Sequence, residues 1–479
     1  MEQIGLEPLK IVVIDDDPTG SQTVHGCPLL LRWDRASLEA GLRHPSPLLF
    51  VLANTRALGA TAAAARLREI CRSLEPALKA AGVTHWLVVS RGDSTLRGHF
   101  PLEREVLSTE LGPFDATLLV PAFLEGGRTT QAGVHQLNGR PVHESAFAQD
   151  RLFGYTTSFL PDWVAEKSGG RLPASSVQQL EGELLTAAAS GPPGQERLRQ
   201  RLAAFRDNVC VAVDGERPEQ LAALGQAIRE LTAPHQPEGG RPRRFLCQSA
   251  ASLIQGLAAL PPQALPPNEL ARLRRRNGAG SLLPGLVLVG SHVPLADQQL
   301  AGLLADPTCA AVELEVDTIA RLLAASAPER PLAELGQQLT HHLAALLATG
   351  RTAVLHTSRG EHPEPEAAAR RRLGLTLAGL MARVAAALAP QLGYLISKGG
   401  ITTHTLLAEG LELTAVELQG QLLPGLSLVL APLPTATALP VLTFPGNLGE
   451  ASTLAQAWRL MEGHNQGGEE GDGGRAGAP

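Results

Sequence analysis

Short apolar runs alternate with longer segments of helical period along most of this 479-residue chain, and this alternation constrains the fold more than any other feature. In the first half, segments such as Thr61–Ala81 have helical spacing and separate the strand-like runs. Those runs are Lys10–Ile14, Leu48–Leu52, Trp86–Ser90, Ala116–Val120 and Val209–Val213. Strands that alternate with helices in this way pair in parallel. The sequence therefore predicts an α/β fold with a largely parallel sheet flanked by helices.

A proline- and glycine-rich stretch interrupts the alternation at 261–284. It holds two proline pairs and the main basic cluster, which we interpret as a solvated helix end or linker. The cluster consists of Arg272, Arg274, Arg275 and Arg276. A second alternation follows, with strand-like runs at Leu286–Val289, Ala311–Leu314, Thr352–His356, Gly393–Ser397 and Val441–Phe444. We predict two α/β domains, 8–260 and 285–460, each with its own largely parallel sheet flanked by helices. The linker joins them, and a disordered tail, 461–479, rich in Gly and Glu, follows.

Composition narrows the class of protein. Hydrophobic residues make up 44% of the chain and charged residues 18%, which fits a globular protein with a full core. A net charge of −6 argues against a general nucleic-acid or membrane-surface binder. Five dispersed cysteines without metal-binding spacing indicate reduced thiols, and no stretch of eighteen uncharged apolar residues occurs. We expect a cytoplasmic protein without nucleic-acid or membrane partners; a homodimer is compatible with the sequence.

Polar, glycine-rich loops follow the first four predicted strands. Ligands of open parallel sheets bind beyond the carboxyl ends of the strands, so these loops are the natural place for a site. The candidate site residues that they carry are Asp15, Asp16, Asp17, Thr19, Asn54, Arg56, Arg91, Asp93, Ser94, Arg97, Gly127, Arg128 and Thr129. Four successive loops of this kind favour one binding site over four unrelated surface turns.

The residue types in these loops indicate what binds there. Arginines offer forked donors for carboxylates or phosphates. Aspartates accept hydrogen bonds from hydroxyls, bind metals or act as general bases. A small acid that bears several hydroxyls would use both sets. The sequence contains neither a GxSxG elbow nor a cysteine beside a His-rich loop, so it gives no indication of a nucleophilic serine or cysteine. The histidines near the loops (His25, His99, His135 and His143) lack metal-binding spacing, and we interpret them as hydrogen-bonding or packing residues.

Three further glycine loops follow predicted strands in the second half. They are Gly290-Ser291, Gly399-Gly400-Ile401-Thr402 and Pro445-Gly446, which continues to Gly449. Glycines let backbone amides approach an anion closely, and threonines at the start of a helix cap its amides. No GxxxxGK[ST], GxGxxG or protein-kinase HRD/DFG set occurs, so phosphate would have to be bound by such loops. Lys398 either adds a point charge there or faces solvent.

Taken together, these segments resemble the four-carbon acid sugar kinase family over residues 8–455. The resemblance rests on the DDxTG-like loop at Asp16–Ser21, the DSTLRG segment at Asp93–Gly98, the PAF…GRTT segment at Pro121–Thr130, and the three glycine loops. It implies an N-terminal domain that binds a sugar acid, a C-terminal domain that binds ATP, and phosphorylation of a hydroxyl of threonate, erythronate or a related acid.

The same resemblance implies roles for individual residues. One of Asp16 and Asp17 would accept the hydroxyl proton while the other orients the substrate or Mg²⁺. The substrate-binding residues would be Thr19, Arg56, Asp93, Ser94, Arg97, Gly127, Arg128 and Thr129, and the nucleotide-binding residues Ser291, Gly399, Gly400, Ile401, Thr402 and Gly446. Asp15, Pro18, Ser21, Ser90 and Arg91 depart from the family's usual residues, and 168–206 is longer and lower in complexity than expected. These departures leave the identity of the substrate open.

Two alternatives remain at this point. The first is a hydrolase or lyase that acts on a sugar acid with the same carboxylates and arginines. The second is a catalytically silent sensor of sugar acid or nucleotide. The three C-terminal glycine loops favour a kinase over the hydrolase, and the presence of both Asp16 and Asp17 favours catalysis over the sensor.

Overall fold

The computed structural model describes residues 9–463 except 22, 237–239, 361–365 and 435. In the N-terminal half the strands are β1 (Lys10–Asp15), β2 (Cys27–Leu30), β3 (Leu48–Leu52), β4 (Trp86–Arg91), β5 (Ala116–Val120), β6 (Arg128–Gln131), β7 (Val134–Leu137), β8 (Arg140–Pro141), β9 (Gln178–Leu180), β10 (Val209–Val213) and β11 (Phe245–Ser249). The helices there are α1 (Arg35–Arg43), α2 (Ala60–Ala81), α3 (Leu102–Leu111), α4 (Leu160–Lys167), α5 (Gly182–Ala189), α6 (Pro192–Ala203), α7 (Pro218–Thr232) and α8 (Ala251–Ala258).

The C-terminal half repeats the alternation of strands and helices. Its strands are β12 (Gly285–Val289), β13 (Cys309–Leu314), β14 (Thr352–Thr357), β15 (Tyr394–Lys398), β16 (Ala415–Leu423), β17 (Leu426–Leu433) and β18 (Ala436–Phe444). Its helices are α10 (Pro294–Leu304), α11 (Val316–Leu323), α12 (Glu329–Ala348), α13 (Ala367–Leu388), α14 (Gly400–Thr405) and α15 (Thr453–Glu462). A short helix, α9 (Pro267–Ala271), lies between the two halves.

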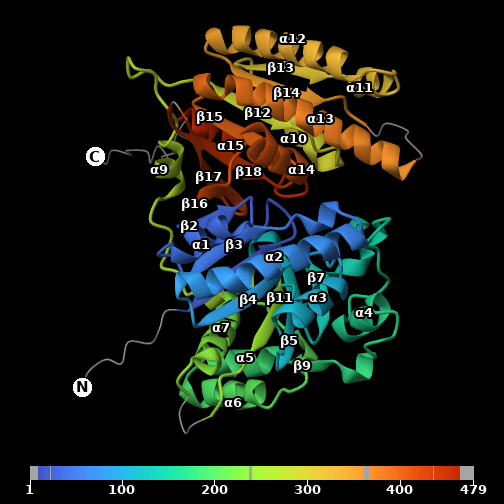
Figure 1. Ribbon diagram of the computed structural model, residues 1–479, viewed down its shortest axis with the longest axis vertical. Coiled ribbons are helices and arrows are strands. Elements are labelled where there is room, and N and C mark those ends of the chain that lie inside the picture. Colours follow the sequence, from blue (N-terminus) through green and yellow to red (C-terminus); the bar gives the residue numbers. More distant parts are fainter. Residues whose placement is uncertain (1–8, 22, 237–239, 361–365, 435, 464–479) are drawn as a thin grey trace, which may run out of the picture.

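One sheet runs through both halves of the molecule (Figure 1). Its strand order is β13-β14-β12-β15-β18-β17-β16-β2-β3-β1-β4-β11-β5-β10-β9. Most pairs within each half are parallel. The exceptions in this sheet are β17, which pairs antiparallel with both β16 and β18, and β16, which pairs antiparallel with β2. The predicted α/β class and the largely parallel pairing are confirmed. The hydrogen-bonded connection through β16 and β2 was not expected, because each half was predicted to have its own sheet.

All ten predicted strands are present, with ends that shift by at most a few residues in most cases. Sequence analysis missed the short β2 and β9, the strand β11, the antiparallel β16 and β17, and the small β6–β8 sheet. Strand β11 matters most for the site, because it lies between β4 and β5 at the centre of the N-terminal sheet. Its sequence, FLCQS, ends in two polar residues and lacks the Val/Leu/Ile run by which the other central strands were recognised.

The interpretation of the basic cluster as solvated is wrong for two of its arginines. Arg274 and Arg275 are buried and fasten the inter-domain segment to the C-terminal half. Arg274 Nη1 contacts Glu462 Oε2 at 2.7 Å, and Arg275 Nη1 donates to the carbonyls of Ala389 and Leu392 at 2.8 and 2.9 Å. Guanidinium groups can be buried when backbone carbonyls and carboxylates accept their hydrogen bonds, which a count of charges in the sequence does not reveal.

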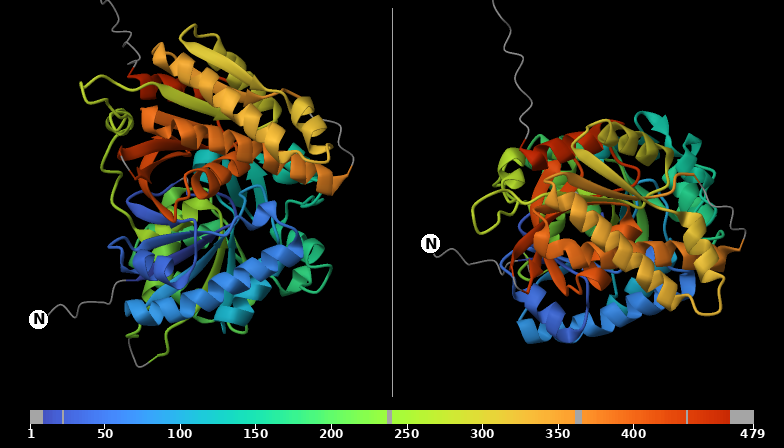
Figure 2. Two further views of the ribbon diagram at one scale, coloured as in Figure 1. Left: turned by 45° about the horizontal axis from the view of Figure 1, so that its top comes forward. Right: turned by 90° about the horizontal axis from the view of Figure 1, so that it is seen from above.

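The start of the expected tail is also ordered. Helix α15 extends to Glu462, and Met461 is buried. Glu462 Oε1 accepts hydrogen bonds from Tyr394 Oη at 2.6 Å and Thr352 Oγ1 at 2.9 Å. The rest of the tail, 464–479, lies outside the described residues. The segment 168–206, which looked low in complexity, forms β9, α5 and α6 against the N-terminal sheet (Figure 2).

One helical stretch, Ala369–Gln391, is long and apolar enough to cross a membrane, with a mean hydropathy of 1.6 over its best window. Of that window, 56% is buried inside the protein. Its inward side chains, among them Leu380, Ala385 and Leu388, belong to the main hydrophobic core. The stretch therefore packs as a core helix.

Candidate active site

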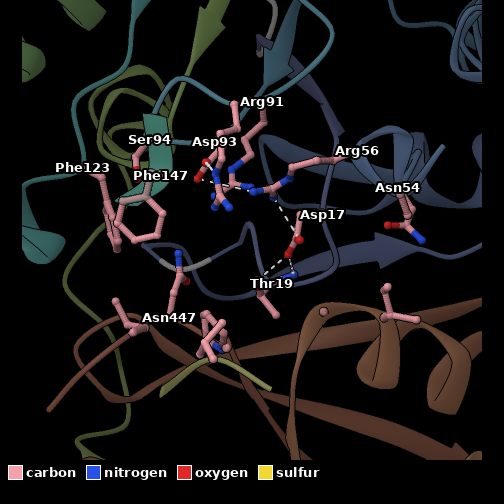
Figure 3. A pocket seen from close by; sticks show the side chains of 18 of the residues that line it. Asp17, Thr19, Asn54, Arg56, Arg91, Asp93, Ser94, Phe123, Phe147 and Asn447 are labelled. Carbon is pink, nitrogen blue, oxygen red and sulfur yellow. Dashed lines mark hydrogen bonds and ion pairs between the residues drawn. The ribbon is translucent and has the colours of Figure 1, made fainter. Parts of the chain in front are cut away.

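A cleft of about 300 Å³ lies between the two halves, where the carboxyl ends of the N-terminal strands face the glycine loops of the C-terminal half (Figure 3). The N-terminal wall is formed by Asp17, Thr19, Asn54, Arg56, Ala57, Arg91, Asp93, Ser94, Arg97, Phe123, Arg128 and Phe147. The opposite wall is formed by Val293, Gly400, Ile401, Pro445, Gly446, Asn447 and Leu448. The strand-end loops of both halves therefore meet at one cavity.

Most of the predicted site residues line this cleft. Those that do are Asp17, Thr19, Arg56, Asp93, Ser94, Arg97, Arg128, Gly400, Ile401 and Gly446. Six others do not: Asp16, Gly127, Thr129, Ser291, Gly399 and Thr402. Asp16 lines a smaller adjoining pocket, and Thr129 pairs with Gln136 in the β6–β7 hairpin. Gly127 adopts φ +70° at the start of the hairpin, a backbone conformation that favours glycine.

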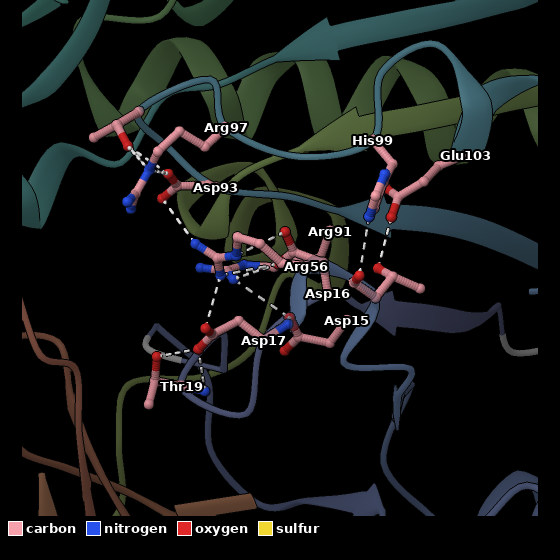
Figure 4. A network of polar contacts seen from close by, with 12 residues as sticks. Asp15, Asp16, Asp17, Thr19, Arg56, Arg91, Asp93, Arg97, His99 and Glu103 are labelled. Atoms are coloured by element: carbon pink, nitrogen blue, oxygen red, sulfur yellow. Dashed lines mark hydrogen bonds and ion pairs between the residues drawn. The ribbon is translucent and has the colours of Figure 1, made fainter. Parts of the chain in front are cut away.

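The three consecutive aspartates have different surroundings (Figure 4). Asp15 and Asp16 are buried, and both contact Arg91 Nη1, at 3.4 and 3.1 Å. Asp17 reaches the cleft with 21% of its side chain exposed. Its Oδ1 accepts hydrogen bonds from the Thr19 amide, at 2.8 Å, and from the Thr19 hydroxyl. The first two aspartates thus anchor the loop, and only the third presents its carboxylate to the cavity.

Arg56 is the centre of the charge network. Its guanidinium contacts Asp16 at 3.2 Å, Asp17 at 3.0 Å and Asp93 at 3.4 Å. Asp93 also contacts Arg97 Nε at 2.7 Å and accepts a hydrogen bond from the Thr95 hydroxyl. These acids are therefore neutralised by arginines. Among the residues that the structure describes, no group of three or more His, Cys, Asp or Glu side chains is placed to hold a metal ion.

The surroundings separate the pKa values of these acids. Burial raises the pKa of Asp15 to about 7 against the attraction of Arg91, and burial also raises the pKa of Asp16. For Asp17, burial is outweighed by the Arg56 charge and the Thr19 hydrogen bonds, which hold its pKa below the usual value. Asp93 behaves like Asp17, because Arg97 and Arg56 overcome the effect of burial and lower its pKa. Asp17 and Asp93 are ionised at neutral pH.

Arg128 is the buried guanidinium in the N-terminal wall that lacks a carboxylate partner. It is 7% exposed, and its contacts within 4.0 Å include no ion pair with any described residue. One of its Nη groups donates to the Gly126 carbonyl, it lies over the Phe123 ring at 5.8 Å, and its Nε has no hydrogen-bond partner. A buried cation with free donors in a cleft wall is suited to an anionic ligand.

The three C-terminal glycine loops converge, as shown by the atoms that an added β-carbon would meet. A β-carbon on Gly290 would lie 2.1 Å from Thr402 Oγ1, and one on Gly446 would lie 2.6 Å from Ser291 Oγ. Gly399 adopts φ +121°, and its β-carbon would lie 3.4 Å from the Ser291 amide nitrogen. The loops that follow β12, β15 and β18 therefore pack around Ser291. Glycine is required there by close approach and, at Gly399, by backbone conformation.

Lys398 does not face solvent. Its side chain is fully buried at the end of β15, where Nζ donates to the carbonyls of Pro445 and Gly446 at 3.1 and 3.3 Å and lies 3.9 Å from the Phe444 ring centre. Burial lowers the pKa of Lys398 to about 7. The lysine thus supports the Pro445–Gly449 loop from behind and is not part of the cleft wall.

Several cleft residues were given no role from sequence, although Asn54 and Arg91 lie in loops that sequence analysis had singled out. Asn54 sits at φ 49°, a conformation that asparagine tolerates better than most residues, and Arg91 ties the aspartate loop to β4. Asn447 lies within the predicted Pro445–Gly449 loop, and Figure 3 shows it reaching from the C-terminal side toward Phe147. Phe147 and Val293 lie outside every motif, so the sequence carried no signal for these two, because their place depends on how the two halves meet.

His99 and His135 are hydrogen-bonding residues in the structure, as predicted from sequence. His135 is buried, with Nε2 2.7 Å from the Ser94 carbonyl and Nδ1 2.9 Å from Thr130 Oγ1. His99 Nε2 lies 3.1 Å from the Thr55 carbonyl and 2.9 Å from that of Leu58. Both rings therefore position strand-end loops.

Comparison with known proteins identifies the family. A family model described as a sugar-binding N-terminal domain matches residues 11–257, and one described as a nucleotide-binding C-terminal domain matches residues 286–454. The chain belongs to the four-carbon acid sugar kinase family. The predicted family and the kinase class are confirmed.

Relatives within the four-carbon acid sugar kinase family cover from half to nearly all of the chain. A D-threonate kinase of Bordetella bronchiseptica is 29% identical over 86% of this chain and 85% of its own length. A D-threonate kinase of Salmonella typhimurium is 26% identical over 95% and 99%, and a D-erythronate kinase of Heliobacterium modesticaldum is 24% identical over 50% and 56%. A solved structure from Haemophilus influenzae, described under the family name DUF1537, has the same fold, with a TM-score of 0.56 at 18% identity, covering 94% of this chain and 100% of its own.

Proposed function

We propose that this kinase transfers the γ-phosphoryl group of ATP to a hydroxyl of a four-carbon sugar acid of the threonate or erythronate type. The observation that carries the proposal is the composition of the cleft. Its N-terminal wall offers a buried arginine without an acidic partner, Arg128, beside an ionised aspartate, Asp17. Its C-terminal wall is built from glycine loops. An acid with hydroxyls and a polyphosphate fit these two walls.

On the acid side, Arg128 binds the carboxylate of the sugar acid. Its free Nε and its burial give a charge-assisted hydrogen bond in a partly dry site. Ser94, Arg97 and Asp93 line the same wall and contact the rest of the substrate. Arg56 does not bind the substrate carboxylate, because its guanidinium already contacts three carboxylates of the protein. It keeps Asp16, Asp17 and Asp93 close together without repulsion.

Of the two candidate bases, Asp17 accepts the proton of the attacking hydroxyl. Asp17 lines the cleft and faces the glycine turn of the other half, whereas Asp16 is buried between Arg56 and Arg91. The low pKa of Asp17 is compatible with this role, because phosphoryl transfer has a loose transition state in which positioning matters more than basicity. Asp16 is a positioning residue for the loop.

On the nucleotide side, the loops around Ser291 and Gly399–Thr402 bind the phosphates of ATP through backbone amides and hydroxyls. Val293 and Ile401, which are 38% and 48% exposed, give the C-terminal wall apolar surface for the nucleotide. Residues 8–260 then form the sugar-acid-binding domain and 285–460 the nucleotide-binding domain. Of the two cleft carboxylates, Asp93 is held by Arg56 and Arg97, so Asp17 is the one that would hold Mg²⁺, with ATP phosphates and water as the other ligands. The ion would supply neutralisation of the phosphate charge.

The hydrolase or lyase and the silent sensor are both less well supported. A hydrolase or lyase has no use for a second wall of converging glycine loops. A sensor has no use for an aspartate held ionised against that wall. We retain the expectations of a cytoplasmic location and of no nucleic-acid or membrane partner, and the oligomeric state, including a homodimer, is to be measured.

The test is ADP release from the full-length protein with ATP and Mg²⁺ over a panel of acids. The panel contains D-threonate, L-threonate, D-erythronate, L-erythronate and D-glycerate, with a no-acid control for ATP hydrolysis. Turnover of at least one four-carbon acid well above the control is expected. ADP release that does not depend on any acid would contradict the kinase assignment, and turnover of glycerate alone would contradict the substrate class.

A further inference from the structure

Three buried polar atoms without hydrogen-bond partners line one small pocket behind the aspartate loop. They are Gln248 Oε1, Ser249 Oγ and Trp163 Nε1, and their side chains are 8%, 3% and 3% exposed. The pocket, about 40 Å³, also contains Asp16, Asp93, Arg97, Glu103 and several apolar side chains. Buried polar groups are hydrogen-bonded in the great majority of cases, so three orphans around one pocket indicate that polar groups, of a ligand or of water, bind there.

The fold places this pocket at the centre of the functional edge of the sheet. Gln248 and Ser249 are the last residues of β11, which lies between β4 and β5, and Gln248 is paired with Ser90 of β4. Trp163 comes from α4 and packs against Phe100, with ring centres 4.8 Å apart and ring planes inclined by 40°. The pocket adjoins the main cleft, because Asp93 and Arg97 line both.

The charges around the pocket select a neutral polar group rather than an anion. Asp16, Asp93 and Glu103 are all acids, and the guanidinium of Arg97 is already held by Asp93 at 2.7 Å. A carboxylate would be repelled here, while the orphan atoms offer acceptors at Gln248 and Ser249 and donors at Ser249 and Trp163. A hydroxyl both donates and accepts, so it satisfies this set.

We propose that this pocket is a specificity subsite, in which Gln248, Ser249 and Trp163 read the non-reacting hydroxyl groups of the sugar acid. The inference rests on the proposed function, since it places the carboxylate at Arg128 and the reacting hydroxyl at Asp17. The remaining hydroxyls then turn toward Asp93 and the adjoining pocket. About 40 Å³ has room for a hydroxyl and a neighbouring water.

The orphan atoms allow a test that separates binding from structure. Gln248→Met and Ser249→Ala each remove an unpartnered polar atom while nearly keeping side-chain shape, so the melting temperature of the ligand-free protein should stay the same or rise. The value of kcat/KM for D-threonate or D-erythronate should fall about 3- to 10-fold in each variant, as for one lost hydrogen bond. Trp163→Phe should lower kcat/KM by a similar factor. Trp86→Phe, at the amino end of β4, is the control for the loss of an indole.

Deoxy analogues make the test specific to a hydroxyl. With 2,4-dihydroxybutyrate and 3,4-dihydroxybutyrate, wild type and variants should have equal kcat/KM on the analogue that lacks the hydroxyl read by the mutated residue. Ser46→Ala is the matched control, because Ser46 Oγ accepts a hydrogen bond from Leu48 N at the opposite end of the sheet. That variant should lower the melting temperature and leave KM unchanged. Equal losses on both analogues, unchanged kinetics in Gln248→Met and Ser249→Ala, or a melting-temperature loss like that of Ser46→Ala would overturn the subsite.

Failure of the subsite and failure of the kinase function can be told apart by calorimetry of D-threonate and D-erythronate binding without ATP. If wild type releases no acid-dependent ADP but binds either acid, and Ser249→Ala and Gln248→Met weaken that binding, the subsite stands and the kinase function falls. If wild type is active and the variants bind and turn over the acids normally, the subsite falls alone. If neither acid binds to wild type, both fall.

Discussion

Asp17 and Gly400 touch across the cleft, so that a β-carbon on Gly400 would lie 2.9 Å from Asp17 Oδ2. Asp17 belongs to the loop after the first strand, and Gly400 begins α14 in the other half of the molecule. The ionised aspartate of the N-terminal wall is therefore seated directly against the glycine turn of the C-terminal wall. Neither half contains a complete site.

This contact predicts that Gly400→Ala impairs catalysis. The added β-carbon forces either the Asp17 carboxylate or the glycine turn to shift, and a misplacement of this order costs roughly 10²-fold in kcat/KM. Gly400→Val should have a larger effect and weaken ATP binding as well. Gly374→Ala, in helix α13 with nothing within 4 Å of the added carbon, is the control. It should raise the free energy of unfolding by about 0.5–1 kcal/mol without changing kcat. Normal kcat in Gly400→Ala would contradict the role of this contact.

Asp17→Asn and Asp16→Asn should differ in their effects on stability. Asp17→Asn should lower kcat by about 10²–10⁴-fold, as for a lost general base. It should lower the melting temperature only slightly, because it loses the charge paired with Arg56 but its amide oxygen can still accept the Thr19 hydrogen bonds. Asp16→Asn should also lower kcat, but Asp16 is buried against Arg56 and Arg91, so its loss should reduce the free energy of unfolding by about 1–3 kcal/mol. Steady-state kinetics and thermal melts check both. Full activity in Asp17→Asn would remove it as the base.

Arg128→Ala should weaken sugar-acid binding much more than ATP binding. A lost charge-assisted hydrogen bond costs roughly 1.5–3 kcal/mol, which corresponds to a rise in KM for the acid of about 10- to 150-fold. Arg97→Ala should also raise KM for the acid, but partly by releasing Asp93 and Asp150, which Arg97 contacts at 2.7 and 3.8 Å. The KM for ATP should stay within a few-fold of wild type in both variants. Equal damage to both ligands would show that the two walls do not divide the substrates as proposed.

Lys398→Met should change how stability depends on pH. Burial lowers the pKa of Lys398 to about 7, whereas an unfolded lysine titrates near 10.4. Between these pH values the unfolded chain binds a proton that the folded protein does not, so the free energy of unfolding rises with pH. Below pH 7 the buried lysine is charged, and it lowers the free energy of unfolding by its full amount. The variant should therefore gain stability relative to wild type by roughly 3 kcal/mol more at pH 6 than at pH 9.

The same variant should raise the KM for ATP about 3- to 10-fold, because the Pro445–Gly449 loop loses the donor to two of its carbonyls. Lys79→Met, on the last turn of α2, is a surface control without an expected change in either quantity. A pH profile of the melting temperature that matches wild type would show that Lys398 stays protonated in the fold.

Much of the site could be predicted from sequence because parallel strands end at the same edge of the sheet. That rule predicts that Asp17, Arg56, Asp93 and Arg128 lie close together, and the cleft contains all four. The rule does not say which of several adjacent side chains points into the cavity. It could not separate Asp16 from Asp17, because that difference comes from burial between Arg56 and Arg91.

What sequence missed has a common physical origin. Gln248 and Ser249 end strand β11, which lacks the usual run of β-branched residues and was therefore not predicted. The loop that follows this central strand was for that reason not included in the predicted site. Arg274 and Arg275 looked solvated because their acceptors are mostly backbone carbonyls from distant segments. Polar residues whose partners are main-chain atoms leave no complementary signal in the sequence.

The pairing of β16 with β2 also bears on any attempt to study the halves separately. Cutting the chain within 261–284 would leave the backbone N–H and C=O groups of both strands unpaired along what had been an interior line of the sheet. Exposed strand edges of this kind recruit other chains, so each isolated half should self-associate, and a nucleotide-binding assay on such a fragment would report on aggregates. Binding to each wall is better measured in the intact chain with one wall disabled by mutation.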